Sequence, residues 1–335
     1  MKLVENEFIK FMEKFDENSF RIILEDGEHL IGDGEPAFTV KINKIPKMMD
    51  MLTSTSITLG EAYMNGDIEI EGDLYTALNM FLGQMGKFST DTKKLKNIIF
   101  TSKSKANQKK EVSSHYDIGN DFYKMWLDET MSYSCGYFKN ENDTLYQAQC
   151  NKVDRILEKL NLSDGMTLCD IGCGWGFLLI EAAKKYNIKG VGITLSKEQK
   201  AKFEQRIKEE NLSDRLEVKL LDYRDLPKQH MEFDRVVSVG MIEHVGRGNY
   251  EEFMQCVKSV LKQGGVFVLH FISALKEYPG DAWVKKYIFP GGVIPSLREI
   301  MQIAGELRFY TVDVESLRRH YNKTLLCWNE NFQQH

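Results

Sequence analysis

The stretch Asp170-Ile-Gly-Cys-Gly-Trp-Gly176 decides the fold expected for the larger part of this chain. It follows the apolar run 166–171 and precedes the run 177–186, so it joins an expected strand to an expected helix. Its glycines let the backbone turn sharply and come close to a ligand at the helix N-terminus, where unpaired amides face outward. The stretch therefore predicts a ligand-binding turn at the carboxyl end of a strand in an α/β fold.

Strands and helices are expected to alternate from this turn to residue 271. The expected strands cover residues 166–171, 190–195, 216–221, 234–239 and 266–271. The expected helices cover residues 177–186, 196–210 and 250–261, and Gly264-Gly265 is expected to close the last of them. This alternation predicts a doubly wound, Rossmann-like parallel sheet.

About a hundred residues precede this part and are expected to form a smaller α+β domain. Residues 57–78 hold a Gly-Asp turn, then alternating Ile68 and Ile70, which predict an edge or half-buried strand, and then a helix that starts near Leu74. The passage resembles sterol-carrier-like lipid-binding modules. A small module that only packs against the larger domain fits the same residues equally well.

Residues 91–110, called the basic segment below, separate the two parts. They hold seven lysines against the single acid Asp91. Because apolar residues recur in it close to helical spacing, the segment could lie on an anionic membrane surface. A solvated linker is favoured on these residues alone, and the two interpretations are compatible. We expect domains at 1–90 and 113–335, joined by a linker at 91–112.

Composition excludes several classes of protein. The net charge of −5 argues against general nucleic-acid binding. No apolar run approaches the length of a membrane-spanning helix, and the N-terminus does not resemble a secretion signal. The six cysteines lack the spacing of zinc sites or disulfide frameworks, and no other set of side chains has ligand spacing. We therefore expect a cytoplasmic protein without a metal.

The glycine spacing suggests a cofactor. G-x-G-x-G directly after an acid resembles the first motif of class I methyltransferases, whereas dinucleotide-binding folds usually have G-x-G-x-x-G. The resemblance implies that the acid and the turn hold the methionine part of S-adenosylmethionine. The residues concerned are Asp170, Gly172, Cys173, Gly174, Trp175 and Gly176.

Two further turns are expected to hold the rest of this cofactor. The second strand ends in Thr194-Leu195-Ser196 instead of an acid, so the ribose is assigned to Thr194, Gln199 or backbone groups. A capping box between Ser196 and Gln199 would explain those two residues equally well. After the third strand, Asp222-Tyr223-Arg224 is expected to enclose the adenine, with Tyr223 over its face. Asp222 as a simple loop residue is the alternative.

Further segments resemble the cyclopropane fatty acid synthases, including the mycolic acid cyclopropane synthases. They are residues 115–122, 131–138, 239–246 and 287–292, and the resemblance runs from His115 to Trp328. The N-terminal module looks like the bacterial, phospholipid-acting branch. The resemblance implies methylene transfer from S-adenosylmethionine to a cis double bond of a membrane phospholipid, by a peripheral protein at the inner face of the membrane. A homodimer is compatible with it.

The resemblance also implies a bound bicarbonate ion that acts as the base, and it assigns site residues. The bicarbonate shell would be Cys135, Glu243, His270, Tyr321 and the backbone of Ile272, with Tyr116 supporting Glu243; Tyr133 and Ser134 would contact the cofactor. The faces of Tyr133, Tyr137 and Phe138 could steady positive charge. Singly, Cys135, His270 and Tyr321 are also explained as ordinary core or amphipathic residues.

Two alternatives to this function stay open at this point. A relative that adds a methyl branch to the same alkene would share every motif. A lipid-binding protein that has lost turnover is a second alternative, although it would have no need of a base site. Members of the resembling family continue past the segment equivalent to residues 325–332 through a further helix and strand, so we expect the sheet and the lipid channel of this chain to lack them.

Overall fold

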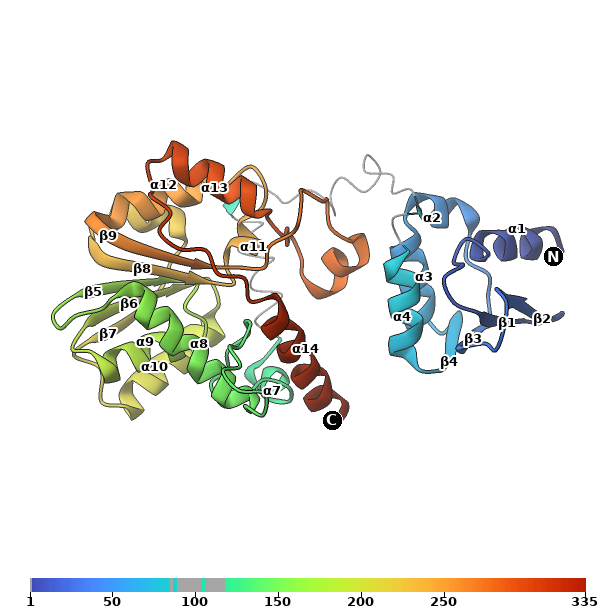
Figure 1. The fold of residues 1–335 in the computed structure, drawn as a ribbon, viewed down its shortest axis with the longest axis horizontal. Coiled ribbons are helices and arrows are strands. Elements are labelled where there is room, and N and C mark those ends of the chain that lie inside the picture. Colours follow the sequence, from blue (N-terminus) through green and yellow to red (C-terminus); the bar gives the residue numbers. More distant parts are fainter. Residues whose placement is uncertain (1, 85–86, 89–103, 106–117) are drawn as a thin grey trace. The chain divides into compact units, whose positions relative to one another are not determined.

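The structure is a computed structural model that describes residues 2–84, 87–88, 104–105 and 118–335 (Figure 1). The chain forms two compact units, one of residues 1–100 with 280–289 and the other of residues 101–279 with 290–335. Most of the basic segment and the predicted site residue Tyr116 lie outside the described residues. The predicted domain bounds stay a prediction, and the sequence did not indicate that residues 280–289 belong with the N-terminal unit.

The N-terminal unit is a four-stranded sheet with helices, in the order β2-β1-β3-β4. β1 pairs with β2 antiparallel and with β3 parallel, and β4 is an antiparallel edge strand beside β3. The elements are α1 (Lys2–Met12), β1 (Phe20–Leu24), β2 (Gly27–Ile31), β3 (Phe38–Ile42), α2 (Met48–Thr53), α3 (Thr55–Met64), β4 (Ile68–Gly72), α4 (Leu74–Gly83) and the π-helix η3 (Val284–Ile288).

Alternation of apolar residues builds the core of this unit. Every second residue of β1 and of β3 is buried, so one face of the sheet lies in the core. Phe15, Phe20 and Phe38 fill it together with Phe81 of α4. The Asp73 side chain accepts hydrogen bonds from the first backbone amides of α4. The predicted edge strand at Ile68 and Ile70 and the helix start at Leu74 are confirmed.

The larger unit is a five-stranded sheet in the order β7-β6-β5-β8-β9, with all neighbours parallel. Its strands are β5 (Thr167–Ile171), β6 (Lys189–Thr194), β7 (Leu216–Leu220), β8 (Phe233–Val239) and β9 (Leu261–His270). Its helices are α7 (Asn120–Lys124), α8 (Leu145–Leu160), α9 (Phe177–Lys185), α10 (Lys197–Glu209), the 3-10 helix η2 (Tyr223–Gln229), α11 (Ile242–Val245), α12 (Tyr250–Val260), α13 (Leu297–Glu306) and α14 (Arg318–Gln333). The predicted doubly wound parallel fold is confirmed.

One predicted boundary is wrong. The sequence suggested that Gly264-Gly265 closes the helix that begins at Tyr250, and that the last strand starts at residue 266. In the structure the helix ends at Val260, and β9 begins directly at Leu261 and contains both glycines. The register between β8 and β9 shifts near Phe233, which accommodates the extra residues as a bulge.

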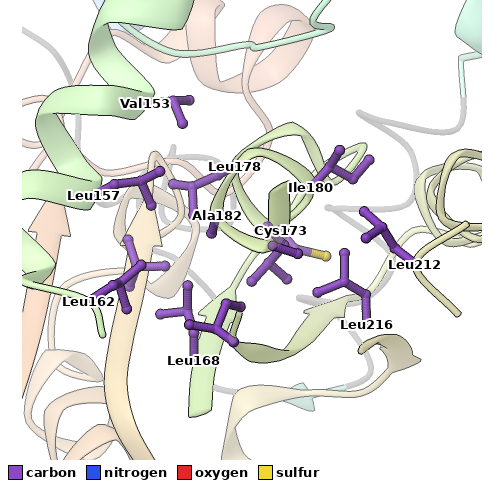
Figure 2. Packing of buried hydrophobic residues seen from close by; sticks show 14 of the residues in the cluster. Val153, Leu157, Leu162, Leu168, Cys173, Leu178, Ile180, Ala182, Leu212 and Leu216 are labelled. Carbon is purple, nitrogen blue, oxygen red and sulfur yellow. The ribbon is translucent and has the colours of Figure 1, made fainter. Parts of the chain in front are cut away.

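Helices cover both faces of this sheet. α8, α9 and α10 lie on one side, and α12 and α13 lie on the other (Figure 1). Leu157 of α8, Leu168 of β5 and Ala182 of α9 belong to the first of these two cores (Figure 2). The order of strands reverses at β5, because β6 lies on one side of it and β8 on the other. The carboxyl ends of β5 and β8 therefore flank the crevice where such sheets bind ligands.

The described residues include no helix that is both long enough and apolar enough to cross a membrane. One lysine of the basic segment, Lys105, lies in the described part of the chain. Its Nζ atom forms an ion pair with Asp225 Oδ1 at 2.9 Å. This end of the basic segment therefore contacts the larger unit, beside η2.

Candidate functional site

The three glycines of the turn after β5 have two different structural roles. Gly172, Gly174 and Gly176 all have positive φ values, of 82°, 54° and 84°. A Cβ atom on Gly172 would lie 2.6 Å from Met241, and one on Gly176 would lie 2.0 Å from the ring of Phe203. A Cβ atom on Gly174 would meet nothing within 4 Å. Two of the glycines therefore allow close packing, and the third leaves space open at the turn.

A cavity at the carboxyl ends of β5, β6 and β8 adjoins this turn. It holds about 1110 Å³ of space, part of which is open to solvent. All the residues that the sequence assigned to the cofactor border it. They are Tyr133, Ser134, Asp170, Gly172, Cys173, Gly174, Trp175, Gly176, Thr194, Leu195, Gln199, Asp222, Tyr223 and Arg224. The structure thus brings four separate segments to one cavity, and their contact with a cofactor stays a prediction.

Asp170 is the buried acid of the cavity. Only 3% of its surface is exposed, and burial raises the pKa of its carboxyl to about 7. Its Oδ1 atom has no hydrogen-bond partner among the described residues. A buried acceptor without a partner is costly, so this oxygen fits a ligand that brings a donor.

Thr194 and Gln199 form a small network of their own at the end of β6. The Thr194 hydroxyl donates to Gln199 Oε1 at 2.7 Å and accepts from the backbone N–H of Ser196 at 3.1 Å. The Ser196 side chain caps α10 by accepting from the Gln199 backbone N–H. The capping box considered from the sequence is thus only half formed, because the Gln199 side chain turns to Thr194 instead. Thr194 and Gln199 therefore stay available as a paired polar edge of the cavity.

The turn after β7 carries an ion pair. Arg224 Nε and Nη2 donate to the two carboxylate oxygens of Asp222, at 2.8 and 2.6 Å, and the guanidinium lies 5.2 Å from the ring centre of Tyr223. Asp222 also caps η2. The Tyr223 ring packs edge-on against Phe253 in the core and borders the cavity as well. Asp222 is therefore more than a loop residue, because it fixes Arg224 at the cavity wall.

Aromatic residues form the wall of the cavity beside the glycine turn. The Trp175 Nε1 donates to Asn120 Oδ1 of α7 at 2.7 Å, and its ring packs against Tyr123. The Tyr133 ring packs against Trp126 and Trp328. Tyr137 and Phe138, considered with Tyr133 as groups that could steady positive charge, lie elsewhere. They contact His320 and Lys323 of α14 and do not border the cavity.

Glu243 anchors a second group of predicted residues, called the Glu243 cluster: Cys135, Glu243, His270, Tyr321 and the backbone of Ile272. Glu243 lies on the short helix α11, next to His244, which borders the cavity. Its Oε1 accepts a 2.7 Å hydrogen bond from the Ile272 backbone N–H, whereas Oε2 has no partner among the described residues. Burial raises the pKa of this carboxyl to about 7.

His270 ends β9, two residues before Ile272. Its Nδ1 atom is buried and has no partner in the described part of the chain. Burial, together with the smaller effect of the nearby Lys152 charge, lowers the pKa of the ring to about 4. The imidazole is therefore neutral at physiological pH, with one N–H donor and one acceptor.

Cys135 and Tyr321 form the other side of the cluster. Cys135 is buried, and its Sγ lies 3.8 Å from the carbonyl oxygen of Leu317, which also accepts from the Tyr321 backbone N–H. Burial raises the pKa of the Cys135 thiol to about 11. Burial also raises the pKa of the Tyr321 hydroxyl, and Glu243 and Cys135 add to the effect. At neutral pH both groups are protonated, so they are donors without charge.

Lys152 borders the cavity and Gln149 holds the backbone of a segment that lines it, and the sequence analysis missed both. They lie on α8, where Gln149 Nε2 donates to the carbonyl oxygens of Ser132 and Ser134, and Lys152 Nζ donates to Ser134 Oγ at 3.0 Å. Both side chains are buried. The signal was present in the sequence, because Lys152 occupies a position of the apolar stripe of an amphipathic helix.

Both parts of the chain match known protein families. Residues 103–335 match the mycolic acid cyclopropane synthetase family, and residues 8–93 match a domain of unknown function, DUF7884. A probable fatty acid methyltransferase of Pseudomonas putida is 39% identical over 93% of this chain and 80% of its own length. A cyclopropane-fatty-acyl-phospholipid synthase of Escherichia coli K12 is 37% identical over 95% of this chain and 83% of its own length.

Two solved structures resemble the larger part of the chain. The cyclopropane synthase MmaA2 of Mycobacterium tuberculosis has a TM-score of 0.64 at 34% identity, over 70% of this chain and 85% of that one. The mycolic acid cyclopropane synthase CmaA1, complexed with SAH and CTAB, has a TM-score of 0.62 at 35% identity, over 68% of this chain and 83% of that one. The chain therefore belongs to the mycolic acid cyclopropane synthetase family and has the class I fold of S-adenosylmethionine-dependent methyltransferases.

Proposed function

We propose that this protein is a cyclopropane-fatty-acyl-phospholipid synthase that transfers a methylene group from S-adenosylmethionine to the cis double bond of a phospholipid acyl chain. The similarity to the Escherichia coli enzyme over 95% of this chain supports the proposal. The observation that carries it is the position of Glu243. Its carboxyl is buried, and one of its two oxygens has no hydrogen-bond partner among the described residues. The next residue on the same helix, His244, borders the cavity.

The residues of the cavity suit S-adenosylmethionine. This cofactor supplies an electrophilic methyl group when it is bound. The space beside Gly174 and the unpaired Oδ1 of Asp170 fit its amino-acid end, and the paired hydroxyl and amide of Thr194 and Gln199 offer hydrogen bonds to a ribose. A cis alkene is a poor nucleophile, so bringing it against the methyl group in a dry site would supply much of the rate.

The Glu243 cluster suits a small oxyanion such as bicarbonate. Bicarbonate would supply a base for the proton that must leave before the ring closes. Cys135, Tyr321 and a protonated Glu243 are neutral donors, and the neutral ring of His270 adds an unpaired Nδ1. Because Glu243 titrates near neutral pH, it can share a proton with the ion and avoid repelling it.

We further propose that the protein meets its substrate as a peripheral protein at the inner face of the cell membrane. Leu74, Tyr75, Leu78 and Leu82 lie along one side of α4 and are exposed, and this helix has no charged residue. A helix that is apolar on its outer as well as its inner side fits contact with acyl chains. The lysines of the basic segment would add attraction to anionic headgroups.

A second candidate activity is methyl branching of the same alkene, which the 39% identity to the Pseudomonas putida protein favours. Incubation with S-adenosylmethionine and vesicles of cis-unsaturated phospholipid tests both. A cyclopropane and a methyl-branched alkene each gain one CH₂ and have equal mass, so the released acyl chains are then hydrogenated mildly. A product that takes up no hydrogen supports cyclopropanation, and one that takes up H₂ supports branching. Failure to gain CH₂ would contradict both.

A further inference from the structure

The wall of the cavity contains a buried cation, Lys152, and a buried anion, Asp170, besides Arg224, which is paired with Asp222. Lys152 is 5% exposed and Asp170 is 3% exposed, and both border the cavity. Asp170 comes two residues after Leu168, whose side chain packs with α8, so the alternation along β5 turns Asp170 toward α8 as well. The helix that carries Lys152 therefore covers the sheet face from which Asp170 projects.

These two charges do not fully satisfy each other. The hydrogen bond that Lys152 Nζ makes is to a neutral group, Ser134 Oγ at 3.0 Å, and Asp170 Oδ1 has no partner among the described residues. The charge of Lys152 does lower the pKa of Asp170, against the larger effect of burial. Burying a lysine and a carboxylate costs free energy unless each finds a partner. Two incompletely paired charges of opposite sign suit a ligand that carries both signs itself.

We propose that Lys152 binds the α-carboxylate of the amino-acid end of S-adenosylmethionine, beside Asp170 and the glycine turn, which the motif already assigns to that end. The inference rests on the proposed function, because it requires this cofactor in the cavity. The cofactor ends in a zwitterion, and the cavity wall offers a cation and an anion beside the glycine turn. Ser134 holds the Lys152 ammonium at the cavity side of α8, and Gln149 fixes the backbone of Ser134 in turn.

The alternative is that Lys152 interacts with an anion bound in the Glu243 cluster. The ammonium lowers the pKa values of His270 and Cys135, so its field reaches that cluster. Lys152 borders the cavity, however, whereas Cys135, Glu243, His270 and Tyr321 do not. Its hydrogen-bond partner Ser134 also borders the cavity. The position of Lys152 at the cavity therefore favours the carboxylate of the cofactor as its binding partner over an ion bound in the Glu243 cluster.

The test combines one substitution with one change in the ligand. Titration calorimetry measures the affinity of the wild type and of Lys152→Met for S-adenosylhomocysteine, which has the complete amino-acid end, and for its decarboxylated analogue. Met keeps the length and apolar stem of Lys without the charge. Lys159→Met, on the same helix but paired with Glu315 away from the cavity, is the matched control. Thermal melting shows whether each variant folds.

We expect the wild type to bind the decarboxylated analogue about 10- to 100-fold more weakly than S-adenosylhomocysteine, as loss of a charged hydrogen bond does. Lys152→Met should lose a similar factor for S-adenosylhomocysteine and bind both ligands about equally, and Lys159→Met should match the wild type. A Lys152→Met protein that still discriminates between the ligands overturns the inference. The inference is also overturned if Lys152→Met binds S-adenosylhomocysteine as tightly as the wild type does but needs a higher bicarbonate concentration for turnover. A wild type that binds neither ligand refutes the proposed cofactor instead.

Discussion

The backbone N–H of Ile272 donates to Glu243 Oε1 at 2.7 Å, and the other oxygen, Oε2, has no partner among the described residues. One bond thus fixes the carboxyl between the end of β9 and α11, and the free oxygen keeps its hydrogen-bonding capacity. Val293 adds to this attachment, because its N–H donates to the Glu243 carbonyl oxygen at 2.9 Å. Glu243 is held firmly, yet its side chain is incompletely satisfied. This combination is expected of a group that meets a ligand.

Glu243→Gln should separate binding from chemistry. The amide keeps an oxygen for the Ile272 N–H but cannot give up a proton, so turnover should fall by about 10²–10⁴-fold. Affinity for S-adenosylhomocysteine and for lipid vesicles should stay within about twofold of the wild type, because Glu243 does not border the cavity. Steady-state kinetics and titration calorimetry measure the two quantities. Equal losses of affinity and of turnover would make Glu243 a structural residue.

A bicarbonate-depleted buffer extends the same comparison. The wild type should slow and then recover when bicarbonate is added back at constant pH. Glu243→Gln should respond little. If both proteins are indifferent to bicarbonate, the assigned base is wrong even though the family is established.

The stability of the wild type relative to Glu243→Gln should depend on pH. Burial on folding raises the pKa of the Glu243 carboxyl from its usual 4.5 to about 7. Between these values the folded chain binds more protons, so the stabilisation is complete below pH 4.5 and is lost as pH rises through 7. The wild type should therefore lose up to about 3 kcal/mol relative to the variant between pH 4.5 and pH 8, at roughly 1.4 kcal/mol per unit of pKa shift. Urea unfolding at both pH values measures it.

Asp170 and His270 also have shifted pKa values, but both are present in the two proteins and their effects cancel in the difference. A difference in unfolding free energy that is the same at pH 4.5 and pH 8 would mean that the Glu243 pKa is not raised by folding.

Much of the fold could be predicted because its signals are local. The apolar runs and the glycine turn placed β5, β6, β7 and β8 within a residue or two, since parallel strands buried on both faces read as apolar stretches. The start of β9 could not be placed in this way. Gly264-Gly265 looks like a helix stop, and only pairing with β8 keeps these residues extended. The grouping of residues 280–289 with the N-terminal unit depends on contacts between residues far apart in the sequence, such as the hydrogen bond from the Tyr287 hydroxyl to Glu61. Such contacts produce no periodic pattern in the sequence.

The site divides in the same way. Motifs assigned residues that the structure gathers at one cavity, because each motif follows a strand and parallel strands end at the same edge of the sheet. The sequence analysis did not identify Lys152 as a site residue, because it lies in the middle of a helix and belongs to no turn motif. The side-chain hydrogen bond between Thr194 and Gln199 was not predicted either, since local rules offered only a capping box as the structural explanation of Gln199. Motifs therefore located the turns of the site, and tertiary structure supplied the helix side chains.

Membrane binding should depend on the basic segment. Replacing Lys93, Lys94, Lys96, Lys103, Lys109 and Lys110 with Gln should weaken binding to anionic vesicles and flatten its salt dependence, since each lysine near such a surface contributes about 1 kcal/mol. Lys105 is kept because it pairs with Asp225. Co-sedimentation at two salt concentrations measures the effect, with neutral vesicles as the control. Unchanged binding to anionic vesicles would leave the segment as a linker only.

Two glycine substitutions should differ in whether they mainly weaken ligand binding or mainly lower stability. Gly174→Ala puts a methyl group into open space at the cavity, where it would displace a ligand that approaches the backbone, and its left-handed backbone adds about 1–2 kcal/mol of strain. This variant should fold but bind S-adenosylhomocysteine at least about tenfold more weakly. Gly176→Ala drives a methyl group into the ring of Phe203, so it should lose about 1–3 kcal/mol more in stability than Gly174→Ala does.

The pair is informative because the two glycines stand two residues apart in one turn and both have positive φ values. Calorimetric titration and urea unfolding are measured on both variants. A Gly174→Ala protein with undiminished affinity would place the cofactor away from this turn, whatever its stability. A Gly176→Ala protein as stable as Gly174→Ala would mean that the Phe203 ring can move aside, and the division of this turn into a packing role and a ligand role would then be wrong.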